Sequence, residues 1–297
     1  MNVTVRNHDY GKSEISFVTA RRTEGGEELT ETTAAVAFEE GFEKAFATGD
    51  NATILPTGAM ANTVLAFAPE YLGAPPERFA LALAEHLAAA CPAAGAVTVR
   101  IASRPWQRID TAQGPDPTGF TAGAPTQDTA KATVFRDDRP PLVSGGLSGL
   151  RLVKTTDARF TGFLRDEFTT IPDFHDRLMG LAADVEWEHD SNDGFDSCRS
   201  AARAALLRSF SEHTSLSGQH TLYVLGSAVL TACPDVTRVH LTCSANDHLP
   251  ADLARFGRAN GNQVYLAPAT PYSLVHLTLE PDGRTPADPG KTRGHRP

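Results

Sequence analysis

Apolar and polar residues alternate near the start of the chain as they do in β-strands, and then group at helical spacing. Pro75 and Pro76 open the second apolar helical pattern and Pro92 ends it, as prolines do at helix boundaries. Strands are predicted at residues 13–22, 33–38, 96–109 and 131–136, and helices at 59–67 and 77–91. The predicted order is ββααββ.

The same order recurs in the second half of the chain. Strands are predicted at 150–155, 184–189, 236–243, 263–266 and 274–279, and helices at 195–210 and 217–233. The glycine-rich run at 145–149 is interpreted as a loop between strands. We therefore expect one unit over residues 1–140, a second over 141–280, and a disordered tail over 281–297, which is rich in proline, glycine and charge.

Composition narrows the class of protein. The 297 residues carry a net charge of −9, which is a poor match to nucleic acid or to an anionic membrane. The chain has no apolar signal core and no run long enough to span a bilayer. The four cysteines form no C-x-x-C pair, so free thiols in a reducing cytoplasm are expected.

Common catalytic motifs are missing from the sequence. It contains no Walker A run and no G-x-G-x-x-G opening a helix, and its ten histidines show neither His-x-His nor His-x-x-x-His spacing. We therefore expect neither a nucleotide cradle nor a metal site built from neighbouring ligands. Periodicity and spacing alone predict a soluble α+β enzyme or binding protein.

Short sequence motifs, taken in order, are more specific than periodicity and spacing. They include YGK at 10–12, GDN at 49–51, RPW at 104–106, GFLRDEFTT at 162–170, QHTLY at 219–223 and NDH at 246–248. In this order and spacing, from Tyr10 to Leu279, the chain resembles the urate oxidase (uricase) family. The resemblance implies two tandem ββααββ tunnelling-fold units with antiparallel sheets, which assemble into a β-barrel oligomer.

The resemblance also implies a proton relay. Lys12 matches the family's catalytic lysine, Thr57 its partner, and His248 the histidine that completes the relay. Taken singly, Lys12 is typical of a solvated turn residue and His248 of a surface or capping residue. A lysine base needs its pKa lowered by burial or nearby charge, whereas histidine suits proton transfer near neutral pH.

Substrate-binding roles are implied for six further positions. Arg177 matches a clamp on the substrate's carbonyl edge, since its planar fork donates two parallel hydrogen bonds. The alternative for Arg177 is an ion pair with Asp173 or Asp176. The other positions match a stacking ring at Phe160, an amide that recognises the purine edge at Gln219, a residue holding dioxygen or water at Asn246, and backbone amides at Gly58 and Gly218.

The implied reaction is the oxidation of urate by dioxygen to 5-hydroxyisourate and hydrogen peroxide, without cofactor or metal. Urate or a related heteroaromatic and dioxygen are the expected partners, in a homotetramer with sites between subunits. Three positions depart from the family pattern: Gly58 and Ala61 stand where the family usually has Asp and Lys, and Gly218 where it has a β-branched residue. An oxidase for another heteroaromatic or modified purine, and a non-catalytic purine-binding relative, therefore stay open as alternatives.

Overall fold

A computed structural model describes residues 3–24, 26–137, 139–266 and 272–283, apart from the side chains of 245–247. The chain is a mixed α+β structure and divides into two compact units. The first comprises residues 1–146, 188–196 and 282–297, and the second residues 147–187 and 197–281. No helix in the described ranges is long and apolar enough to cross a membrane.

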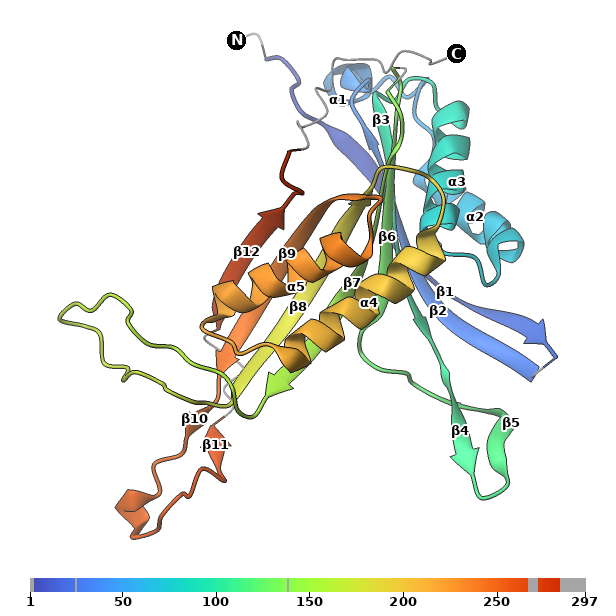
Figure 1. Ribbon diagram of the computed structural model, residues 1–297. Coiled ribbons are helices and arrows are strands. Elements are labelled where there is room, and N and C mark those ends of the chain that lie inside the picture. The colour runs from blue at the N-terminus through green and yellow to red at the C-terminus, as the bar shows by residue number, and fades with distance from the viewer. Residues whose placement is uncertain (1–2, 25, 138, 267–271, 284–297) are drawn as a thin grey trace. The chain divides into compact units, whose positions relative to one another are not determined.

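The first unit is an antiparallel sheet in the order β1-β2-β3-β6, with α2 and α3 on one face (Figure 1). A core of buried side chains, including Phe38, Leu83 and Val99, fills the space between the layers. The elements are β1 (Asp9–Thr23), β2 (Gly26–Glu39), α1 (Glu43–Thr48), α2 (Thr57–Phe67), η1 (Ala68–Tyr71), α3 (Pro76–Ala90), β3 (Ala96–Pro105), β4 (Gln107–Thr111), β5 (Gly114–Thr121) and β6 (Gln127–Phe135).

The second unit has the strand order β7-β8-β9-β12, with β9 and β12 antiparallel, and α4 and α5 cover one face (Figure 1). Its core includes the fully buried Trp187, Leu206 and Leu222. The elements are β7 (Leu142–Lys154), β8 (Met179–His189), α4 (Phe195–Glu212), α5 (Gly218–Ala232), β9 (Val236–Asp247), β10 (Leu249–Pro250), η2 (Ala254–Phe256), β11 (Tyr265–Leu266) and β12 (Ser273–Leu279).

The structure corrects two sequence predictions and adds elements that were not predicted. The strand expected over 96–109 ends at Pro105, and β4 begins a separate hairpin with β5 that the sequence analysis missed. The glycine run 145–149 is not a loop, because it lies inside β7 and residues 143–147 are buried. Helix α1 was not predicted, because its six residues bury no side chain and leave no apolar pattern. Most of the tail predicted to be disordered, residues 284–297, lies outside the described residues.

Candidate active site

Lys12 lies on β1, the outer strand of the first unit's sheet, beside a β-bulge. The register pairs Lys12 with Val36 and then Ile15 with Ala34, so β1 carries one extra residue between them. Glu14 takes up the irregularity with a left-handed φ of 56°. Because a bulge changes the direction in which nearby side chains point, it sets how the exposed Lys12 side chain leaves the strand.

Thr57 and Gly58 are the first two residues of α2. Pro56 occupies the N-cap position and supplies no side-chain cap. The first hydrogen bond of the helix runs from the Ala59 amide to the Pro56 carbonyl at 2.8 Å, so the amides of Thr57 and Gly58 precede it. Gly58 is exposed, and a Cβ added there would meet no atom within 4 Å. This helix start thus presents backbone donors beside open space.

Tyr10 ties the Lys12 strand to the Thr57 helix. The Leu55 amide donates to the Tyr10 hydroxyl oxygen at 2.9 Å, so the tie lies two residues from Lys12 on one side and two from Thr57 on the other. The ring packs edge-on against Phe42 with centroids 4.8 Å apart. Burial raises the pKa of Tyr10 to about 12, which keeps the hydroxyl protonated. In the sequence, this tyrosine is visible only as the first residue of the YGK motif.

Phe160 and Arg177 come together in the second unit, on the long loop between β7 and β8. The loop returns on itself through a two-residue bridge, in which Phe160 and Phe174 exchange backbone hydrogen bonds of 2.8 and 2.9 Å. The Arg177 guanidinium carbon lies 5.4 Å from the Phe160 ring centroid. The Phe163 ring stacks on the Phe160 ring, with centroids 4.8 Å apart. A half-buried aromatic face therefore lies beside a guanidinium fork.

Arg177 and His248 line the same small cavity, although 70 residues separate them in the chain. Its volume is about 60 Å³, room for about two water molecules but far less than an aromatic ligand needs. The His248 ring lies directly against the backbone of Gly180 on β8: a Cβ added to Gly180 would lie 2.5 Å from His248 Cε1. Gly180, which no sequence pattern marks, therefore leaves the space that His248 occupies.

The two carboxylates considered as ion-pair partners of Arg177 also accept hydrogen bonds from other groups. Asp173 accepts from Arg165 at 3.3 Å. Asp176 accepts from the Thr156 hydroxyl at 2.7 Å and from the Ala158 amide, and these hydrogen bonds hold its pKa below the usual range. Asp176 thus fastens the start of the loop to the segment that carries Arg177.

Gly218 and Gln219 are the first two residues of α5. Ser217 caps this helix, since its hydroxyl accepts from the His220 amide at 3.0 Å. Gln219 is exposed, and a Cβ on Gly218 would meet no atom within 4 Å. Asn246 lies near the end of β9, but its side chain falls outside the described residues. The candidate residues therefore form two groups: Lys12, Thr57 and Gly58 in the first unit, and Phe160, Arg177, Gly218, Gln219, Asn246 and His248 in the second.

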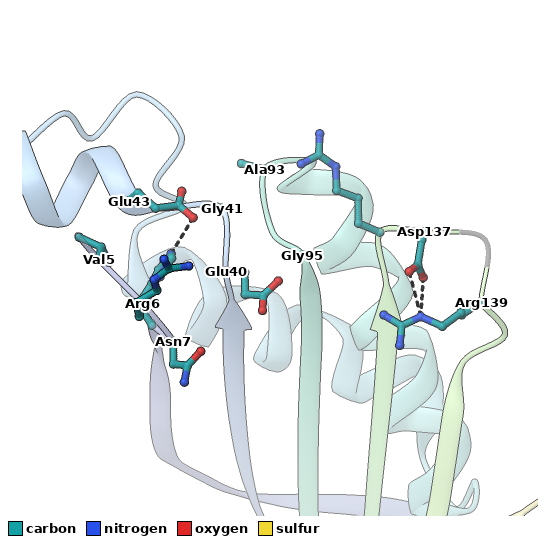
Figure 2. Close-up of a pocket in the computed structure, with 12 residues that line it drawn as sticks. Val5, Arg6, Asn7, Glu40, Gly41, Glu43, Ala93, Gly95, Asp137 and Arg139 are labelled. Atoms are coloured by element: carbon teal, nitrogen blue, oxygen red, sulfur yellow. Dashed lines mark hydrogen bonds and ion pairs between the residues drawn. The ribbon is translucent and has the colours of Figure 1, made fainter. Parts of the chain in front are cut away.

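A larger cavity of about 690 Å³ lies in the first unit, and the candidate residues do not line it (Figure 2). Its charges are of both signs: Arg139 is paired with Asp137 at 2.7 Å, and His8 faces Glu43 at 3.9 Å. His8 Nε2 already accepts from the Phe42 amide. Because none of the residues that the resemblance singles out lies in its wall, this cavity is not the candidate active site. Within the described ranges, no three His, Cys, Asp or Glu side chains cluster as metal ligands.

Known proteins resemble this chain in sequence and in fold. Residues 143–276 match the family model described as Uricase. Uricase of Arthrobacter globiformis is 28% identical over 282 residues, covering 95% of this chain and 91% of that protein. Uricase of Danio rerio is 29% identical over 284 residues, covering 94% and 95%. The crystal structure of the Arthrobacter globiformis uricase matches with a TM-score of 0.87 at 27% identity, covering 100% of this chain and 99% of that one. In family model, in sequence along nearly the whole chain and in fold, this chain is therefore similar to proteins of the uricase family.

Proposed function

We propose that this oxidoreductase converts urate, dioxygen and water into 5-hydroxyisourate and hydrogen peroxide, in the cytoplasm and without a cofactor. Two electrons leave the urate ring and reduce dioxygen to peroxide, and the oxygen of water becomes the new hydroxyl. The urate dianion is electron-rich enough to reduce dioxygen directly. The protein then has three tasks: to remove a proton, to hold the ring flat, and to position the oxygen.

Arg177, Phe160 and Gln219 are proposed to hold the ring. The Phe160 face offers a stacking surface, and the Arg177 fork next to it donates two parallel bonds to an oxygen-rich edge. The Gln219 amide supplies one donor and one acceptor at the exposed start of α5. The amides of Gly58 and Gly218, each in the first turn of a helix, add donors that favour an anionic substrate.

Lys12, Thr57 and His248 are proposed to move the proton. Lys12 takes it from the bound ring through the Thr57 hydroxyl, and His248 exchanges protons with solvent or peroxide on the far side. Two contacts support this arrangement: the Tyr10–Leu55 hydrogen bond restrains Lys12 relative to Thr57, and Gly180 gives His248 its position beside Arg177. Asn246 is proposed to hold dioxygen or water over the ring.

The active form is proposed to be a homotetramer of tandem tunnelling-fold units, closed into a barrel through the outer strands β1 and β12. Each site then combines Lys12 and Thr57 of one subunit with Arg177 and His248 of another. Large apolar side chains on the β7–β8 loop support burial by another subunit: Leu164 is 94% exposed and Phe168 79% exposed. The cavity of about 60 Å³ beside Arg177 also needs a further wall and more room to become a substrate site.

The observation that carries the proposal is the meeting of Phe160, Arg177 and His248, which come from separate parts of the second unit. The test is to mix purified chain with urate and follow the ultraviolet absorbance of urate together with peroxide. One peroxide per urate consumed is expected, and chelator should have no effect. Urate that stays unchanged, with no peroxide formed, would disprove the proposal.

A second candidate is an oxidase of the same type that acts on another heteroaromatic ring. The open space at Gly58 and Gly218 favours it, because a Cβ at either position would meet nothing within 4 Å. Two positions that carry side chains in ordinary family members are therefore vacant here, and a larger ring could use that room. Urate, xanthine and larger purine analogues, compared by binding and by peroxide yield, distinguish the two candidates.

A further inference from the structure

Cys198 and Cys233 bring two thiols together at one end of the helix pair that covers the second unit's sheet. Cys198 lies in the first turn of α4, and Cys233 is the residue that ends α5. The Cys233 thiol donates to the Cys198 carbonyl at 3.3 Å, and the two thiol groups are also hydrogen-bonded to each other. Neither cysteine belongs to the candidate active site.

The environment of this pair differs from that of the other two cysteines. Hydrogen bonds from Cys198 and from the backbone of Ala202 lower the pKa of the Cys233 thiol, which favours the reactive thiolate. Cys243 is buried, and burial raises its pKa to about 11. Cys91 is buried in the other unit, where it donates to the Thr53 carbonyl.

We propose that Cys198 and Cys233 are a peroxide-reactive dithiol that closes reversibly into a disulfide. The Cys233 thiolate attacks the O–O bond of hydrogen peroxide, its sulfur is oxidised to sulfenic acid, and the departing hydroxide becomes water. The Cys198 thiol then displaces the second hydroxide as water and forms the S–S bond. Two thiols and one peroxide thus give one disulfide and two waters. The proposal rests on the proposed function only for the source of peroxide.

Access and proximity support this order of events. Cys198 is half-buried, so a molecule as small as peroxide can approach the pair from that side, while Cys233 is only 3% exposed. Because the resolving thiol already lies within hydrogen-bond reach, a sulfenic acid formed at Cys233 is captured before further oxidation. The pair therefore suits a protein that must survive a peroxide it produces.

The disulfide would also constrain the fold. It links residues 35 positions apart and joins the start of α4 to the end of α5. Closing a loop of this length restricts the unfolded chain, so the oxidised protein is expected to melt at a higher temperature than the reduced one. The far end of α5 carries Gly218 and Gln219, so the link also restrains the helix that presents them.

The test begins with reduced, desalted protein treated either with added hydrogen peroxide or with urate and dioxygen. Titration of thiols after denaturation should fall from four to two, with a Cys198–Cys233 peptide pair found by mass spectrometry. Dithiothreitol should restore all four, and catalase should block the urate arm. Cys198→Ser and Cys233→Ser should each abolish the link, whereas Cys243→Ala, the matched control, should retain it.

The two arms separate this inference from the proposed function. Disulfide formation with added peroxide but not with urate would leave the dithiol intact and count against urate oxidation. Measured peroxide production from urate, with four thiols remaining in both arms, would overturn the dithiol alone. Links between chains, or irreversible oxidation of single cysteines in place of the pair, would overturn it as well.

Discussion

Substitution of Gly180 by alanine is a direct test of the role assigned to His248. A Cβ at this position would lie 2.5 Å from His248 Cε1 and 3.0 Å from Nδ1. Carbon atoms in contact lie about 3.5 Å apart, so the ring must move by about 1 Å. The backbone of β8 is buried and part of a sheet, which makes movement of the imidazole the easier response.

The displacement sets the size of the expected effect. A shift of about 1 Å in a group that must meet its partner in a fixed geometry costs about 100-fold in turnover. This corresponds to about 2.7 kcal/mol of transition-state free energy. Crowding of a packed site also costs about 1–3 kcal/mol in folding stability. Gly180→Ala should therefore lower kcat for urate much more than it raises KM.

Gly226→Ala is the matched control. Its Cβ would lie 2.6 Å from Leu279 Cδ1 and 2.9 Å from Leu241 Cδ1, so it crowds the same unit without touching a candidate site residue. Steady-state kinetics and thermal melting of both variants separate the two effects. We expect both to lose stability and only Gly180→Ala to lose turnover. Wild-type turnover in Gly180→Ala, or an equal loss in Gly226→Ala, would refute the reasoning.

Four further expectations follow from the site and its surroundings. Lys12→Met should bind urate normally yet slow turnover by roughly 100-fold or more, measured as kcat beside a ligand Kd, since it removes the proton acceptor; unchanged kcat would contradict this role. Arg177→Ala should mainly raise KM, by roughly 10-fold or more, because a charge-assisted bidentate contact is lost; a pure kcat effect would argue against the clamp. Gly58→Asp should raise kcat/KM for urate modestly, by roughly 2- to 10-fold, if the missing carboxylate tunes Lys12; larger purine analogues should lose activity in the same variant. Burial holds the pKa of His213 below its ordinary 6.5, so the unfolded chain binds this proton more readily and stability should fall as pH drops below about 6.5; melting curves of His213→Gln should show a weaker dependence over that range.

Helices and strands with a buried face could be predicted from the sequence, because burial leaves a periodic pattern. Helix α3 combines prolines at its start with buried Leu83 and Leu87 at helical spacing, and its predicted and observed bounds agree within a residue. The β4–β5 hairpin buries no residue, so no such pattern marked it. The glycines of β7 were misinterpreted because glycine signals turns in sequence, whereas here Gly145 and Gly146 lie buried inside a strand.

The candidate site was predictable only by resemblance. The meeting of Phe160 and Arg177 depends on a loop closed by a two-residue bridge, and the meeting of Arg177 and His248 depends on where β9 ends. Neither arrangement leaves a periodic pattern in the sequence. Tyr10 acts through its hydrogen bond with the Leu55 amide, and Gly180 acts by lacking a side chain where the His248 ring lies. Both roles can be recognised only in three dimensions.

The uncapped start of α2 has a consequence for stability as well as for binding. A serine or aspartate at position 56 would satisfy the first-turn amides permanently and strengthen the helix by about 1 kcal/mol. Pro56 leaves those donors to water, and a bound anion can take them over. The helix is thus less stable alone than it could be, and a ligand at Thr57 and Gly58 would complete the local fold as it binds. Selection for a more heat-resistant chain would favour a cap at this position, and that cap would compete with the substrate for the same hydrogen bonds.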